Sequence, residues 1–302
     1  AASALPRGPS LSQSKSASVL SGSGWMVEPK PGVYEPQKKL SHQEFVVAHT
    51  TFGRVASVHL SIPMPEERPL YRELFERHAV ILGDMNQTWN RLINLGRIVD
   101  PVSFAAAYMP SYLPSCDMDQ FNSIPPSFDQ VVINKKNGLV AVELAEKQVA
   151  HLQKVRVFPR KQILNRPDLC SDHVSVEAVV RKRNGEKIRC ATWNVADPWY
   201  FGRFIPQAAL GFAKNDESLR LAQIRGHVSI LLRRSDCVAL QEVPHALAPF
   251  LEDDASQAGF GLRKSTLCPS KLDTDEDRNE NCPLIMLFIR TEYAGTSDID
   301  HV

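Results

Sequence analysis

The stretch V-S-V-E-A-V-V-R-K-R-N-G-E-K-I-R-C-A-T-W-N, residues 174–194, decides how this chain folds. Two strand-like runs flank Asn184-Gly185. Asn-Gly is the strongest short hairpin signal, because both residues tolerate positive φ. The stretch therefore predicts two strands that turn back on each other, with no domain boundary at residue 184.

Other apolar runs on both sides of this hairpin predict further strands. They cover residues 45–62 (two strands), the run that ends at Asp84, 127–134, 236–243 and 284–290. Helices are predicted after Pro69 and over residues 218–234, where apolar residues recur at helical spacing. Residues 100–127, rich in Pro, Ser and Tyr, predict a long loop. Strands with occasional helices favour an α/β fold of stacked sheets with helices outside.

Composition sets broad limits on the class of protein. The chain has 302 residues, 43% of them apolar, and a formal net charge of +1, which neither requires nor excludes a nucleic-acid partner. No run approaches the 18 or so apolar residues of a membrane span, so no membrane partner is expected. Six cysteines without C-x-x-C spacing argue against a zinc site and indicate reduced thiols in an intracellular compartment.

The N-terminal part differs from the rest in composition. Its first 27 residues are rich in Ser, Ala and Gly, and no acid precedes Glu28. Residues 1–40 are expected to be a flexible Ser-rich tail. A remnant of an organelle-targeting peptide, which would make the protein mitochondrial, is the alternative.

Several predicted strands end in residues that bind metal or phosphate. These residues are His59, Asp84, Asn86, Asp129, Asp172, His173, Asn194 and Glu242. Each has an ordinary structural explanation when taken alone. Asp84 and Asn86 share a face if the chain stays extended, but Gly83-Asp84-Met85-Asn86 is also typical of a turn, and the turn is favoured from that stretch alone.

Together these residues supply what metal-assisted phosphodiester cleavage needs. Glu242, Asn194 and Asp172 offer oxygen ligands for a divalent cation, with Glu242 as the principal ligand. His173 can deprotonate a water, and Asp129 can fix its tautomer. Asp84 and Asn86 would orient the attacking water and hold a phosphate oxygen. His59 could hydrogen-bond the phosphoryl oxygen as negative charge develops in the transition state.

The strings T-W-N, L-Q-E-V, G-D-M-N and S-D-H resemble the signatures of the endonuclease/exonuclease/phosphatase superfamily. The resemblance implies a two-sheet α/β sandwich with the site at one edge, Mg²⁺ or Mn²⁺ as cofactor, and a nucleic-acid substrate. It assigns Asn194 and Glu242 to the metal, Asp84 and Asn86 to the nucleophile, and Asp129 with His173 to the acid–histidine pair.

The motif order departs from that family. In the family, T-W-N and L-Q-E-V come first, and the His strand, G-D-x-N and S-D-H follow. In this chain the two groups of motifs come in the opposite order. We favour a circular permutation of one domain over residues 41–302, with the family's C-terminal half at 41–183 and its N-terminal half at 186–302. Two half-domains of a tandem protein are the alternative. Ala196, where many family nucleases carry an Asp, favours one principal ion.

Three functions fit these residues. The first is a Mg²⁺-dependent phosphodiesterase that cleaves nucleic acid with a His-activated water. The second is a catalytically silent subunit of a ribonucleoprotein assembly, and the third is a phosphatase on a small or lipid phosphate ester. The near-complete constellation favours an enzyme, because a scaffold has no need for Asp84, Asn86 and His173 together.

Overall fold

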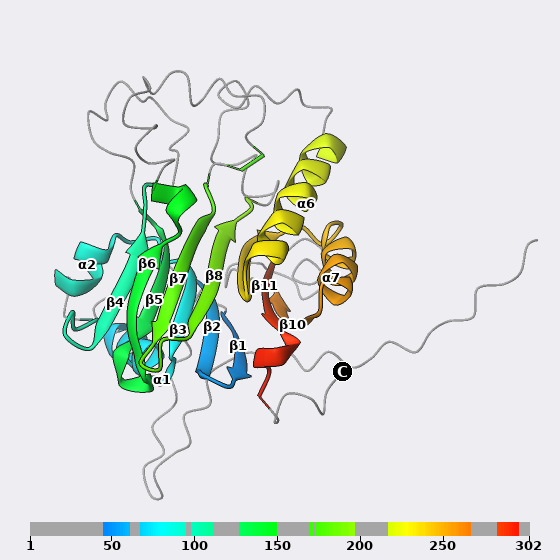
Figure 1. Ribbon diagram of the computed structural model, residues 1–302. Coiled ribbons are helices and arrows are strands. Elements are labelled where there is room, and N and C mark those ends of the chain that lie inside the picture. The colour runs from blue at the N-terminus through cyan, green and yellow to red at the C-terminus, as the bar shows by residue number, and fades with distance from the viewer. Residues whose placement is uncertain are drawn as a thin grey trace, which may run out of the picture.

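The computed structural model describes residues 45–60, 67–94, 98–111, 127–149, 170–171, 173–196, 217–266 and 283–295. These residues form two mixed β-sheets with few helices, and Figure 1 shows β6, β7 and β8 of one sheet in front of the other. The expected tail at residues 1–40 and the candidate ligand Asp172 lie outside the described residues.

The β1–β5 sheet has five strands in the order β1–β2–β3–β5–β4. Its strands are β1 (Phe45–Thr50), β2 (Gly53–His59), β3 (Val80–Asp84), β4 (Phe104–Tyr108) and β5 (Asp129–Asn134). β2 and β3 are parallel, with helix α1 (Arg68–Arg77) between them in the chain, and the other pairs are antiparallel. A short helix, α2 (Trp89–Asn94), follows β3.

The β6–β11 sheet has six strands in the order β10–β11–β9–β8–β7–β6. Its strands are β6 (Leu139–Leu144), β7 (Val176–Lys182), β8 (Lys187–Asn194), β9 (Cys237–Val243), β10 (Phe260–Thr266) and β11 (Leu284–Arg290). Only β8 and β9 pair in parallel; helix α6 (Glu217–Arg234) lies between them in the chain, and α7 (Ala248–Gln257) precedes β10. The antiparallel β7–β8 hairpin confirms the first prediction, and Gly185 takes a φ of 89° at its turn.

Three apolar layers hold the sheets and helices together. The middle layer lies between the sheets and includes Leu82 and Val180. One outer layer packs α1 on the β1–β5 sheet, and the other packs α6 and α7 on part of the β6–β11 sheet. Ile81 points to an outer layer while Leu82 points to the middle one, so β3 is apolar on both faces. The predicted two-sheet α/β sandwich with helices outside is confirmed.

The predicted loop over residues 100–127 is wrong at β4. The run F-A-A-A-Y forms a strand there because every residue of it pairs with β5 in the sheet. Alanine has little strand propensity, so this strand depends on its neighbour rather than on its own sequence. Elements α2, β6, α7 and β10 were not expected from the sequence either. None of the described helices is long and apolar enough to cross a membrane.

The buried histidine at the end of α1 predicts a pH-dependent stability. His78 is 1% exposed, its Nδ1–H donates to Leu74 O at 2.7 Å, and burial, with the charges of Arg54 and Arg77, lowers its pKa to about 4. The unfolded chain therefore protonates first as pH falls, since an ordinary histidine has a pKa of about 6.5. The contribution of His78 is complete above pH 6.5 and is lost between about pH 6.5 and 4, by roughly 3 kcal/mol at most.

Chemical denaturation of the protein and of His78→Gln across this pH range measures that loss. We expect the free energy of unfolding of His78→Gln to fall less steeply with decreasing pH than that of the parent protein. The exposed His245, changed to Gln, controls for the removal of an imidazole. Parallel curves for the parent protein and His78→Gln would contradict the prediction.

Candidate functional site

The topology brings the predicted strand tips to one edge of the sandwich. β2 and β3 run parallel, so their last residues His59 and Asp84 are paired, and Asp84 also pairs with the first residue of β5, Asp129. In the other sheet, Asn194 at the end of β8 pairs with Gln241 of β9. Carboxyl ends of parallel strands meet at the same edge of a sheet, and here both sheets contribute such a pair.

Side chains from the two sheets contact one another at this edge. Asn194 Nδ2 donates to Asp84 Oδ2 at 3.2 Å and to Glu242 Oε1 at 3.0 Å. His59 Nε2 lies 3.0 Å from Glu242 Oε1 and 3.7 Å from Asp84 Oδ2. The two halves of the chain therefore meet within one molecule, although Asn194 and Asp84 are 110 positions apart in the sequence.

His173 and Asp129 form a buried pair beside these residues. His173 Nδ1 lies 2.7 Å from Asp129 Oδ2, and His173 Nε2 lies 3.8 Å from Asp84 Oδ2. A carboxylate on Nδ1 favours the tautomer with its proton there and leaves Nε2 with a lone pair. Nε2 is thus directed toward Asp84, as a general base acting on a water in the site requires.

Asn86 lies in a turn and not on a continued strand. β3 ends at Asp84, Asn86 has a φ of 47°, and its N–H donates to Asp84 Oδ1 at 2.7 Å. Asn86 Nδ2 donates to Leu60 O at 2.9 Å, which fixes the turn against the end of β2. The turn favoured from this stretch alone is therefore confirmed, and the chain is not extended through Asn86.

A β-bulge directs Glu242 into the site. Leu240 pairs with Met286 and Val243 with Leu284, so Gln241 and Glu242 together face the single residue Ile285. Glu242 has a φ of 55° there, and with Asn86 and Ala196 it makes up the positive-φ non-glycine residues in the described part of the chain. Such conformations cost about 1–3 kcal/mol each and cluster at functional sites. Because bulges re-aim side chains, Gln241 and Glu242 can both face the other sheet.

Burial and mutual charge set the proton affinities of this cluster. Burial raises the pKa of Asp84, and the negative charge of Asp129 raises it further. The charges of His173 and His59 lower it, but they do not outweigh burial. Burial also raises the pKa of Glu242, but the hydrogen bond and charge of His59 outweigh it and leave that pKa lowered. Burial lowers the pKa of His59, yet Glu242 and Asp84 outweigh it and leave that pKa raised.

These residues have the composition of a cation site. Ligand atoms of Asp84, Asp129 and His173 all lie within 4.8 Å of one another and can hold a metal. His173 Nδ1 and Asp129 Oδ2 already contact each other, so Asp84 and Glu242, which share Asn194 Nδ2 as a donor, are the better oxygen ligands for a hard cation. Buried carboxylates that crowd together are stabilised by a bound cation, and the residues present therefore fit one.

Two serines that the sequence analysis missed hold the acid–histidine pair in place. The Ser111 hydroxyl accepts the N–H of Asp129 at 3.0 Å, and Ser111 O accepts the N–H of Val174 at 2.8 Å. Ser171 Oγ donates to Asn194 O at 2.8 Å and accepts the N–H of His173 at 3.0 Å. Ser171 belongs to the S-D-H string, so its place before His173 was the available signal.

Arg220 of α6 joins the two segments that carry Asn194 and His173. It is 3% exposed, and its Nη1 donates to Cys170 O, Val195 O and Ala196 O at 3.1, 3.2 and 2.8 Å. The helix predicted over residues 218–234 could have indicated this residue, because Arg220 lies on the same stripe as the apolar Ile224 and Val228. A charged residue on a buried stripe requires partners of this kind.

No protein-family model and no curated protein matches the chain. Among solved structures, a humanized D. rerio TDP2 with 14 mutations is similar at 10% identity over 82% of each chain, with a TM-score of 0.35. ANGEL2, a 2′,3′-cyclic phosphatase in complex with adenosine-2′,3′-vanadate, is similar at 11% identity over 74% of this chain and 56% of that chain, also with a TM-score of 0.35.

Proposed function

We propose that this chain is a divalent-metal-dependent phosphodiesterase of the endonuclease/exonuclease/phosphatase type that hydrolyses nucleic-acid phosphodiester bonds. One observation carries the proposal. The Asp129–His173 pair directs His173 Nε2 toward Asp84, which the Asn194 amide links to Glu242 from the other sheet. A base and a cation site are thus placed side by side, and hydrolysis of a phosphodiester needs both.

Each residue has a role in the proposed reaction. His173 takes the proton of the attacking water at Nε2, and Asp129 holds the resulting imidazolium at Nδ1. His59 donates from Nε2 to the phosphoryl oxygen as negative charge develops. Asp84 orients the water, and Glu242 with Asp84 would hold Mg²⁺ or Mn²⁺. Asn194, predicted as a further ligand, turns its amide nitrogen toward both carboxylates and its Oδ1 toward the N–H of Ala196, so it would position the ligands and not bind the ion. When bound, the cation supplies Lewis-acid polarisation of the phosphoryl oxygen.

The connection at residues 183–186 supports a circular permutation of that fold. β7 and β8 are antiparallel neighbours joined by the Asn184-Gly185 turn, which is the condition for linking a former C-terminus to a former N-terminus. Residues from both halves contact each other in one chain, which supports permutation over the tandem alternative. One permuted domain over residues 41–302 remains our proposal for the organisation of the chain.

Hydrolysis assays with and without Mg²⁺ test the proposed function. Single-stranded RNA, duplex DNA, 5′-tyrosyl DNA and an inositol phosphate serve as substrates, because the last would reveal the phosphatase alternative. We expect cleavage of a nucleic acid that stops on chelation and returns with Mg²⁺ or Mn²⁺. Glu242→Gln keeps the shape of the side chain and should lower the rate at least about 100-fold, since it weakens the metal site.

Undiminished cleavage in the presence of chelator would contradict the metal-dependent mechanism. Hydrolysis of the inositol phosphate alone would favour the phosphatase. A folded protein that cleaves none of the substrates, with or without metal, and that co-purifies with RNA-binding proteins would favour the silent ribonucleoprotein subunit. Thermal unfolding of Glu242→Gln, followed by circular dichroism, shows whether the variant is folded in these assays.

A further inference from the structure

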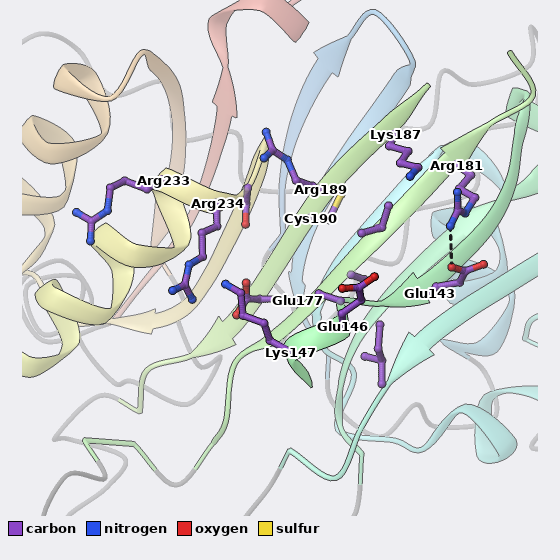
Figure 2. Close-up of a pocket in the computed structure, with 15 residues that line it drawn as sticks. Glu143, Glu146, Lys147, Glu177, Arg181, Lys187, Arg189, Cys190, Arg233 and Arg234 are labelled. Carbon is purple, nitrogen blue, oxygen red and sulfur yellow. Dashed lines mark hydrogen bonds and ion pairs between the residues drawn. The ribbon is translucent and has the colours of Figure 1, made fainter. Parts of the chain in front are cut away.

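A charged groove lies on the outer face of β6, β7 and β8, away from the middle layer. Its volume is about 460 Å³, and it is bounded on one side by the C-terminal end of α6. Figure 2 shows Arg233 and Arg234 on α6 at one side of it, and Arg181 and Lys187 on the strands at the other. The apolar layer under α6 and α7 includes Ala191 and Trp193 of β8 but no residue of β6 or β7.

The groove carries an excess of positive charge. Its cationic side chains are Lys147, Arg181, Lys187, Arg189, Arg233 and Arg234, against three glutamates. Arg181 pairs with Glu143 at 3.1 Å, and Arg189 pairs with Asp236 at 2.8 Å. Within the part of the chain that the structure describes, the other four cations have no carboxylate within 4 Å, whereas only two glutamates are left without a cation. The unpaired charge of the groove therefore selects an anionic ligand.

The chemistry of the lining indicates which anion fits. Arg233 and Arg234 are adjacent exposed guanidiniums, the groups best suited to bind phosphate in a bidentate manner. No aromatic side chain is among the lining residues that the structure describes, so these residues offer bases no platform on which to stack. A ligand held here is bound by its phosphates and not by its bases.

One end of the groove lies close to the edge of the sandwich that carries His173. Gln148, next to Lys147 of the lining, donates from Nε2 to Ser175 O at 2.8 Å and accepts the N–H of Glu177 at 3.1 Å. Ser175 lies two residues after His173 and immediately before β7, a strand that lines the groove. A strand of nucleic acid that leaves the site along this face would pass over Lys147 toward Arg233 and Arg234.

We propose that this groove is an exosite that binds the phosphate backbone of a nucleic-acid strand outside the catalytic site, without preference for base sequence. The proposal rests on the proposed function for the nature of the substrate. The affinity for long strands then depends on Arg233 and Arg234, whereas binding of the reacting phosphodiester does not.

The test compares the double variant Arg233→Gln/Arg234→Gln with the parent protein. Binding of a labelled 30-nucleotide single strand is measured by fluorescence anisotropy over a range of salt concentrations, together with hydrolysis of a small chromogenic phosphodiester. We expect the variant to bind the strand on the order of tenfold more weakly at low salt. The slope of log affinity against log salt should fall by about 1.4, for two lost phosphate contacts. Hydrolysis of the small substrate should be unchanged.

Lys136→Gln/Arg183→Gln is the matched control, because both residues are exposed and neither lines the groove. Equal affinities and slopes for the two double variants would overturn the exosite. The exosite would also be overturned if polyglutamate displaced the labelled strand and unlabelled nucleic acid did not. If the parent protein binds the strand through Arg233 and Arg234 but hydrolyses no substrate, the exosite stands and the proposed function fails.

Discussion

Replacing His173 by alanine is expected to lower phosphodiester hydrolysis by about 10²–10⁴-fold, because general-base catalysis contributes about that much. His173 is the imidazole whose Nδ1 contacts Asp129, and its Nε2 points toward Asp84. Asp129→Asn should reduce the rate to a similar degree, because an amide that donates to Nδ1 favours the tautomer with its proton on Nε2. The measurement is the initial rate at saturating Mg²⁺ on the substrate that the parent protein cleaves best.

His227→Ala is the matched control for the loss of a nearby imidazole. His227 Nε2 lies 3.0 Å from Ser175 Oγ, and its ring packs edge-on against Trp193, but it has no contact with the carboxylates of the site in the described structure. We expect His227→Ala to lower stability and to leave the rate per folded molecule within a few-fold of the parent. A His173→Ala variant with the parent rate would refute the assignment of the base.

Gly83→Ala is expected to prevent the chain from reaching its native fold. A Cβ at Gly83 would lie 1.9 Å from Val58 O, a backbone atom of the paired strand β2, and Gly83 has a φ of 152° that side chains rarely adopt. The clash can be relieved only by separating β2 from β3, which also separates His59 from Asp84. The variant should show no cooperative thermal transition by circular dichroism and no activity.

Gly226→Ala provides the matched control. This glycine lies within α6, and a Cβ there would meet no atom within 4 Å other than those of its chain neighbours and its own helix backbone. The alanine is expected to stabilise the protein by up to about 1 kcal/mol, since glycine is the poorer helix former. A Gly83→Ala variant that melts at the temperature of the parent protein would show that β2 and β3 tolerate a side chain between them.

The sequence predicts the strands that carry strong local signals. The β7–β8 hairpin has its Asn-Gly turn, and β11 is found over the predicted residues 284–290. Strand β4 has no such signal, since its alanines become a strand only through pairing with β5. The bulge in β9 is also invisible in the sequence, because it depends on the register between β9 and β11.

The candidate site was predicted through residue types at strand ends, and the structure brings His59, Asp84, Asp129, His173, Asn194 and Glu242 to one edge. Their roles remain predictions. The sequence does not indicate that Ser111 and Arg220 hold them in place, because both residues bind backbone atoms of distant segments. Such contacts produce no recognisable residue spacing in the sequence. A charged residue on the apolar stripe of a predicted helix, as at Arg220, can still be recognised.

The hairpin has a consequence for how the protein folds. His173 lies just before β7 and Asn194 ends β8, and Trp193 Nε1 donates to His173 O at 3.0 Å across 20 positions of chain. Closing a short loop costs little entropy, so this pairing is among the easiest long-lived contacts for the nascent chain to make. One part of the site, which bears His173 and the amide of Asn194, can thus assemble early, before the two strands that bring Asp84 and Glu242 dock against it.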